Sequence, residues 1–214
     1  MQSSDDDNTD GAVFIAKVAA AAAHDLNNCL AVLGEQGGLV ADLAWMMQNG
    51  RPLDPARLAA VAEGVKRHVA RAGAITAGLS ALAHTLGAQR ESATPACLAA
   101  LCGTLFARFA DRARVRLTVC AADEAGDFDG DQFGFVRLLF ACLEGAVACQ
   151  PDGGEASLAV AGGGGEFTVT VRIAGGAFPR DFASAPQIAA LCRDLRLTAN
   201  VTEAGKALHI APAR

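Results

Sequence analysis

Apolar residues recur at alternating steps of four and three positions through the first quarter of the chain. The stripe consists of Leu26, Leu30, Leu33, Gly37, Val40, Ala44 and Met47. This spacing is the 3.5-residue period of a coiled coil, and it predicts a long amphipathic helix over residues 12–48. Residues 1–11 are mostly polar and acidic, and we expect them to form a disordered tail.

A second stripe of the same period follows a turn at residues 49–52. Asp54 and Pro55 are typical of a helix N-cap and first helical position, and Gly87 is typical of a helix end. The stripe between them runs through Leu58, Val61, Val65, His68, Ala72, Ile75, Leu79, Leu82 and Leu86. The two helices predict an antiparallel hairpin over residues 12–87, about 45 Å long. Because a lone hairpin leaves half of its apolar stripe in water, we expect a homodimer with a four-helix bundle.

The periodicity changes after a polar linker at residues 88–95. Over residues 96–214 the predicted order of elements is α-β-α-β-β-α-β-β. Helices are expected near 95–110, 131–149 and 186–195, and strands near 115–119, 157–161, 167–173, 197–201 and 207–210. This order favours one mixed sheet covered on one face by helices. The predicted fold class is therefore α + α/β, a helical hairpin followed by an α/β sandwich.

Composition narrows the possible environments and partners. The net charge of −5 argues against a general nucleic-acid binder, which would show a basic patch. No apolar run reaches the ~18 residues of a membrane span, and the acidic N-terminus differs from a signal peptide. The seven cysteines are an odd number without framework spacing, which indicates reduced and mostly buried thiols. We expect a cytoplasmic protein with no membrane and no nucleic-acid partner.

Candidate chemistry is concentrated in the run from His24 to Asn28. With Leu26 and Leu33 at heptad position d, His24, Asp25 and Asn28 fall at b, c and f, on the solvent side of the helix. A neutral imidazole is a nucleophile, a neighbouring carboxylate can accept its proton, and an amide can position water or an incoming aspartate. On spacing alone, an ordinary exposed histidine on an alanine-rich helix is an equally good interpretation.

The other three histidines give weaker signals. His68 falls at an inner position of the second helix, which favours a core role, whereas His84 is predicted to face solvent near the level of His24. His209 belongs to the last predicted strand. No pair of histidines has the spacing of metal ligands, so no metal site is expected.

The run His24-Asp25-Leu26-Asn27-Asn28-Cys29-Leu30 resembles the phosphoacceptor box of two-component sensor histidine kinases. In that family the helical pair is the dimerisation and histidine-phosphotransfer domain. The resemblance implies that His24 carries the phosphoryl group, that Asp25 assists its phosphorylation, and that Asn28 supports dephosphorylation of the response regulator. Cys29 stands where the family often has a proline, so no kink is expected there.

The second domain resembles the ATP-binding domain of these kinases in its order of elements, but it departs from it at the nucleotide site. The two asparagines of the family's N-box would fall at Ala141 and Gly145. The strand that ends at Gly176 lacks the aspartate of the Asp-x-Gly-x-Gly motif, and the lid before Ala189 is short and without its glycines. The resemblance implies a Bergerat-like sandwich without an ATP lid, a degenerate ATPase-like domain that does not hold MgATP.

The combination is similar to the histidine phosphotransferases of alphaproteobacterial phosphorelays. It implies that His24 relays a phosphoryl group between the receiver domains of a hybrid histidine kinase and of response regulators. No cofactor of its own is expected, and Mg²⁺ would come with the partner receiver. We expect the receiver to dock on Ala31, Gly34 and Glu35 below His24, with Gly78 on the second helix.

Two other functions remain open from the sequence. A response-regulator phosphatase would use Asn28 to orient water, and His24 would never be phosphorylated. A dimeric scaffold would bind receivers without catalysis. An autophosphorylating kinase is the least favoured interpretation.

Overall fold

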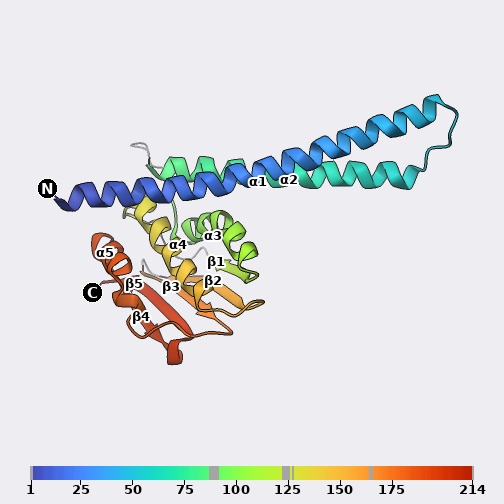
Figure 1. Ribbon diagram of the computed structural model, residues 1–214. Coiled ribbons are helices and arrows are strands. Elements are labelled where there is room, and N and C mark those ends of the chain that lie inside the picture. Colours follow the sequence, from blue (N-terminus) through green and yellow to red (C-terminus); the bar gives the residue numbers. More distant parts are fainter. Residues whose placement is uncertain (1, 87–91, 122–125, 127, 164–165, 214) are drawn as a thin grey trace. The chain divides into compact units, whose positions relative to one another are not determined.

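The computed structural model describes residues 2–86, 92–121, 126, 128–163 and 166–213. The chain divides into two compact units, Met1–Leu79 and Ser80–Arg214. A helical hairpin is followed by a mixed α/β sandwich, which confirms the predicted fold class (Figure 1). Gly87 and residues 88–91 of the predicted linker lie outside the described residues.

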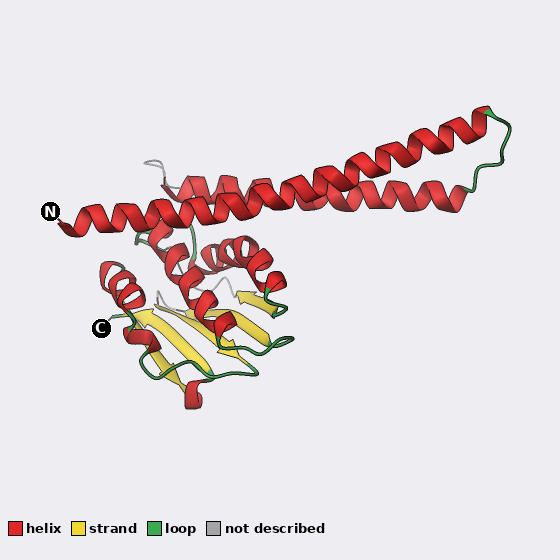
Figure 2. Cartoon of the chain, in the orientation of Figure 1, coloured by secondary structure: helices red, strands yellow, loops and turns green. Residues whose placement is uncertain are grey.

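Helix α1 spans Gln2–Gln48 and helix α2 spans Pro55–Leu86, and the two run antiparallel (Figure 2). Helix α1 therefore begins within the segment for which the sequence predicts a tail. In the connection, Gly50 has a φ of 72°, a left-handed conformation that glycine adopts without strain. Asp54 is the N-cap of α2, as predicted, because its Oδ1 accepts a hydrogen bond from the Ala56 N–H at 2.9 Å.

The inner face of the hairpin consists of a mixture of large and small side chains. The buried apolar residues of the first unit are Phe14, Val18, Cys29 and Leu43 on α1 and Val61 on α2. Gly64 is buried as well, and a Cβ at this position would lie 3.5 Å from the side chain of Gln36. The two helices are therefore in direct contact through this face.

Most of the stripe predicted to face inward on α1 faces outward in the single chain, although Leu26 and Leu33 are half-buried. Leu30 is 63% exposed, Val40 44% and Met47 56%, whereas Cys29, one position before Leu30, is buried. Helix α1 carries two adjacent stripes of the same period, and the one that contains Cys29 and Leu43 faces α2. The pattern identified the helix correctly and its inner face wrongly.

The second unit contains three helices and five strands in the described part of the chain, besides two short 3₁₀ turns. The elements are α3 (Pro95–Arg112), β1 (Arg116–Ala121), α4 (Gln132–Ala148), β2 (Glu155–Gly163), β3 (Glu166–Ile173), α5 (Pro186–Asp194), β4 (Leu197–Thr202) and β5 (Ala207–Pro212). The strand order is β1-β2-β3-β5-β4. Strands β1 and β2 are parallel and the other neighbours are antiparallel, so the sheet is mixed, as predicted.

Helix α4 forms the centre of this unit. Every residue from Gln132 to Phe140 is buried, because the sheet lies on one side of the helix and α3 and α5 lie on others (Figure 1). Phe106 of α3 packs edge-on against Phe140 of α4, with ring centroids 4.9 Å apart. A helix that is apolar on all sides is typical of such a buried position.

No helix in the described part of the chain combines the length and the apolarity that a membrane crossing requires.

Candidate functional site

His24 and Asn28 lie one helical turn apart on the exposed surface of α1. The Asn28 Nδ2 is 3.0 Å from the His24 Nδ1, a hydrogen-bond distance. The α-helix produces this contact locally, since side chains at i and i+4 lie one above the other on the same face. The structure thus brings together two of the three residues that the sequence singles out, and it leaves both accessible from solvent.

The amide of Asn28 can set the tautomer of the His24 ring. With the amide nitrogen turned to the ring, Nδ1 accepts and the ring proton is on Nε2. With the amide oxygen turned to the ring, Nδ1–H donates and Nε2 carries the lone pair. A half-turn of one amide therefore converts Nε2 from a donor into a nucleophile.

Asp25 lies on a different face from the one expected. Its side chain is only 12% exposed, and its Oδ2 forms an ion pair with the Nη2 of Arg71 on α2, at 3.7 Å. The sequence placed Asp25 at a solvent-facing heptad position because the leucine stripe was taken as the inner one. With the inner face shifted to the stripe that contains Cys29, Asp25 falls on the helix–helix interface.

Arg71 is the site residue that sequence reasoning missed. It lies between His68 and Ala72, two residues of the predicted stripe. The register of the hairpin does not single it out, because residue 25 comes level with residue 78 when counted from Gln48 and Pro55 at the connection.

The predicted receiver-docking residues divide into two groups. Ala31, Gly34 and Glu35 are exposed on α1, and a Cβ at Gly34 would have no atom within 4 Å. Gly78, in contrast, is buried, so it is not part of an accessible surface on the single chain. Gly78 lies one turn before the buried Leu82, on the same face of α2.

The remaining histidines do not join the His24 site in the described structure. His84 is exposed near the end of α2. His68 is partly buried, and its Nδ1 has no hydrogen-bond partner. His209 of β5 makes a 3.1 Å contact from Nδ1 to the Thr170 hydroxyl of β3. No cluster of metal-ligating side chains occurs among the described residues.

In the second unit, the region where the kinase resemblance would place a nucleotide is packed with aromatic rings. Phe182 lies against Gly145 of α4, and a Cβ at Gly145 would be 2.2 Å from two carbons of the Phe182 ring. Phe178 packs on Phe182 with ring centroids 5.0 Å apart. The Phe182 ring thus fills the space that a side chain at position 145 would occupy.

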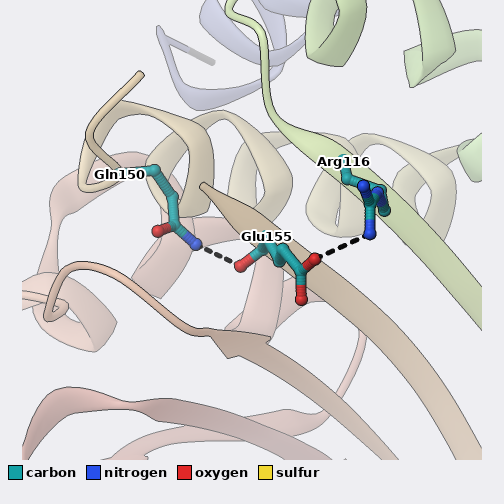
Figure 3. Close-up of polar contacts among 3 residues, drawn as sticks. All are labelled: Arg116, Gln150 and Glu155. Carbon is teal, nitrogen blue, oxygen red and sulfur yellow. Dashed lines mark hydrogen bonds and ion pairs between the residues drawn. The ribbon is translucent and has the colours of Figure 1, made fainter. Parts of the chain in front are cut away.

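Hydrogen bonds from two sides hold the loop after β3, residues 174–176. The Gln150 side chain accepts a hydrogen bond from the Gly175 N–H at 2.9 Å. It also donates one to the backbone oxygen of Glu155 (Figure 3). The Glu155 carboxylate in turn pairs with Arg116 at 2.9 Å. Lys206 donates to the backbone oxygens of Ala174 and Gly176. This loop is the one in which the kinase resemblance would require an aspartate, and protein side chains hold it here.

No known family profile and no curated protein matches the chain. Among solved structures, it is similar to the histidine kinase AdeS of Acinetobacter baumannii, with 13% identity, coverage of 89% of this chain and 97% of that one, and a TM-score of 0.48. It is also similar to a bacterial phosphotransferase, with 13% identity, coverage of 94% and 96%, and a TM-score of 0.46.

A third similar structure is the blue-light activated histidine kinase of Erythrobacter litoralis, with 19% identity, coverage of 74% of this chain and 63% of that one, and a TM-score of 0.49. At such low identities these likenesses concern the arrangement of elements alone.

Proposed function

We propose that this chain is a phosphotransfer protein in which His24 takes a phosphoryl group from the aspartyl phosphate of one receiver domain and passes it to another. The observation that carries the proposal is the His24–Asn28 contact at 3.0 Å on an exposed helix surface. It supplies an accessible nucleophile together with a neighbour that selects the tautomer of the ring. The partners are receiver domains of response regulators and of a hybrid histidine kinase.

The transfer step balances without any oxidant or further reactant. The Nε2 lone pair of neutral His24 attacks phosphorus, a P–N bond forms, and the P–O bond to the donor aspartate breaks. The donor leaves as a carboxylate. The step uses the amide orientation in which Asn28 Oδ1 faces the ring, so that the ring proton stays on Nδ1 and Oδ1 accepts its hydrogen bond. Transfer to the second receiver runs the same step in reverse, and Mg²⁺ comes with the receiver.

The packing of the second unit supports a phosphoryl source other than ATP. Phe182 takes the space beside Gly145 that a magnesium-binding side chain would need. Lys206 and Gln150 hold the loop that would otherwise read the nucleotide. In this proposal the chain binds no ATP, and the phosphoryl group comes from a receiver.

The outward stripes of the hairpin support a homodimer as the working form. On α2, Leu58, Val69 and Leu86 are exposed, as Leu30, Val40 and Met47 are on α1. Exposed apolar side chains on both helices match the surface that a second hairpin would cover in a four-helix bundle. A second copy of this chain is the occupant that we propose.

One observation favours a second candidate function. The Asn28 amide is exposed beside His24, so it could orient a water molecule toward a receiver's aspartyl phosphate. Such a phosphatase would leave His24 unlabelled and would keep activity without the imidazole. A scaffold would neither accept the phosphoryl group nor change its lifetime.

The deciding experiment mixes the full chain with a receiver that carries radiolabelled phosphate. Acid-labile label on the wild type, chased onto a second receiver and absent from His24→Ala, is the expected result. His84→Ala is the matched control, because it removes an exposed histidine from the other helix. Faster loss of label from the receiver with none on the chain would replace the proposal by the phosphatase. Binding with no movement of label would replace it by the scaffold.

A further inference from the structure

The ion pair between Asp25 and Arg71 links the second helix to the phosphoacceptor box. Asp25 follows His24 directly on α1, and its side chain is 12% exposed on the inner face of the hairpin. Arg71 belongs to α2, its Nη2 lies 3.7 Å from the Asp25 Oδ2, and its side chain is 55% exposed. One side chain thus extends from the interior layer of the hairpin to its solvent-exposed surface.

A carboxylate in this position needs a partner. Burial of an ionised carboxylate is unfavourable unless a positive charge or hydrogen-bond donors accompany it. The guanidinium of Arg71 has five N–H donors in a planar fork, so pairing with one carboxylate oxygen leaves donor capacity toward solvent. Arg71 can therefore hold Asp25 in place and still present positive charge at the surface.

The charge balance at the site changes when His24 carries a phosphoryl group. Phosphorylation brings about two negative charges next to the Asp25 carboxylate. Without a cation nearby, this repulsion would disfavour the phosphohistidine relative to the receiver's aspartyl phosphate. A partly exposed arginine on the facing helix is placed to offset it.

We propose that Arg71 is a positioning residue for the phosphotransfer reaction, which holds Asp25 beside His24 and favours the phosphorylated form of the site. The inference rests on the proposed function, since it concerns the same histidine. It adds a residue of α2 to a site that the sequence motif confines to α1. It also makes the partition of label between chain and receiver depend on a residue that need not touch the phosphoryl group.

The test uses the full chain and measures the fraction of label on His24 at equilibrium with a labelled receiver, together with the rate of approach. We expect Arg71→Met to lower the equilibrium ratio of label on His24 to label on the receiver by about fivefold, the order of one partly exposed charge pair. Arg71→Lys, which keeps the charge, is expected to restore most of the ratio. The matched control is Arg67→Met, an exposed arginine one turn away on α2.

A purely structural role would give a different pattern. In that case Arg71→Met would lower the midpoint of thermal unfolding. The ratio of label on His24 to label on the receiver would stay unchanged in the folded fraction. If Arg71→Met does not fold, the double variant Asp25→Asn with Arg71→Met removes both charges and leaves no unpaired carboxylate. If Arg71 acts through Asp25, the double variant should show the same ratio of label on His24 to label on the receiver as Asp25→Asn alone.

Several outcomes would overturn the inference. They are an unchanged ratio in Arg71→Met, an equal loss in Arg67→Met, and independent effects of Asp25→Asn and Arg71→Met. These outcomes all require a labelled wild type. A wild type that takes no label contradicts the proposed function itself, and the role of Arg71 falls with it.

Discussion

At the scale of single residues, the His24 site depends on contacts that are one turn or one helix apart. The sequence motif identified His24 and Asn28 because an i, i+4 pair is determined by the helix itself. It could not identify Arg71, since the partner of Asp25 depends on which face of α1 meets α2. A one-position shift of the inner face moved Asp25 from solvent to the interface.

The Asn28 amide should control the rate at which His24 is phosphorylated. Asn28→Ala removes the hydrogen bond at Nδ1, so the ring loses both its orientation and its preferred tautomer. We expect transfer from a labelled receiver to slow by about fivefold, the order of one hydrogen bond. Asn27→Ala, an exposed amide that points elsewhere on α1, serves as the control. Equal rates for the Asn28 variant and the wild type would rule out this role.

The cysteines should fall into a reactive and an unreactive class. Cys97 and Cys120 are exposed, whereas Cys29, Cys102, Cys142 and Cys192 are buried, so most of the thiols are buried, as expected. Burial raises the pKa of the Cys192 thiol to about 11 and that of Cys142 well above its usual range. A disulfide reagent at pH 8 should modify Cys97 and Cys120 rapidly and the buried thiols only after unfolding.

The raised pKa values also determine how stability depends on pH. The thiols of Cys142 and Cys192 stay protonated in the folded chain, while in the unfolded chain they ionise at the ordinary pKa of a thiol. Their contribution is therefore complete below about pH 8.5 and decreases as the pH rises above it. Urea unfolding at pH 7.5 and 9.5 should show lower stability at the higher pH, and Cys192→Ala should reduce that difference.

At the scale of the elements, the patterning predicted each helix and strand near its observed position. The alternation of apolar and polar residues identified β3, and the 3.5-residue period of apolar residues identified α1 and α2. The pattern could not choose between two adjacent apolar stripes on one helix, because both satisfy the same period. That choice depends on how closely the helices approach, which is a property of the pair.

Val69 on α2 should lie in the interface of the proposed homodimer. Val69 is 54% exposed in the single chain, and a charge there would be buried by a second hairpin. Val69→Glu is expected to shift the protein from dimer to monomer, with light scattering after size exclusion as the measurement. Ala70→Glu, one position along and turned to the polar side with Arg67, should remain dimeric. A monomeric wild type would contradict the proposed assembly.

At the scale of the whole molecule, the two units contribute different kinds of evidence. The hairpin carries His24, the histidine that the motif selects, while the sandwich carries the packing of Phe182 on Gly145. The order of elements in the sandwich was predictable from sequence because it depends on local patterning. That Phe182 lies on Gly145 was not predictable, since the two residues are 37 positions apart and meet only in the folded unit.

Gly145 and Phe182 should be coupled in stability. Gly145→Ala places a Cβ 2.2 Å from the Phe182 ring, so we expect a loss of about 2 kcal/mol in unfolding free energy. In the double variant Gly145→Ala with Phe182→Ala the ring is absent. The alanine at 145 should then cause no further loss of unfolding free energy beyond that of Phe182→Ala alone. Gly126→Ala, where a Cβ meets nothing within 4 Å, should have little effect. Additive effects of the two substitutions would contradict this packing.

The contact between Gly145 and Phe182 also has an evolutionary consequence. A mutation that places an asparagine at position 145 would first meet the aromatic ring and lower stability, before any new ligand could bind. A mutation that removes the ring would leave an apolar gap and would also bring no immediate benefit. Selection therefore meets two unfavourable single steps on the way to one useful combination. This epistasis would slow any exchange of glycine for a polar side chain at position 145 in descendants of this chain.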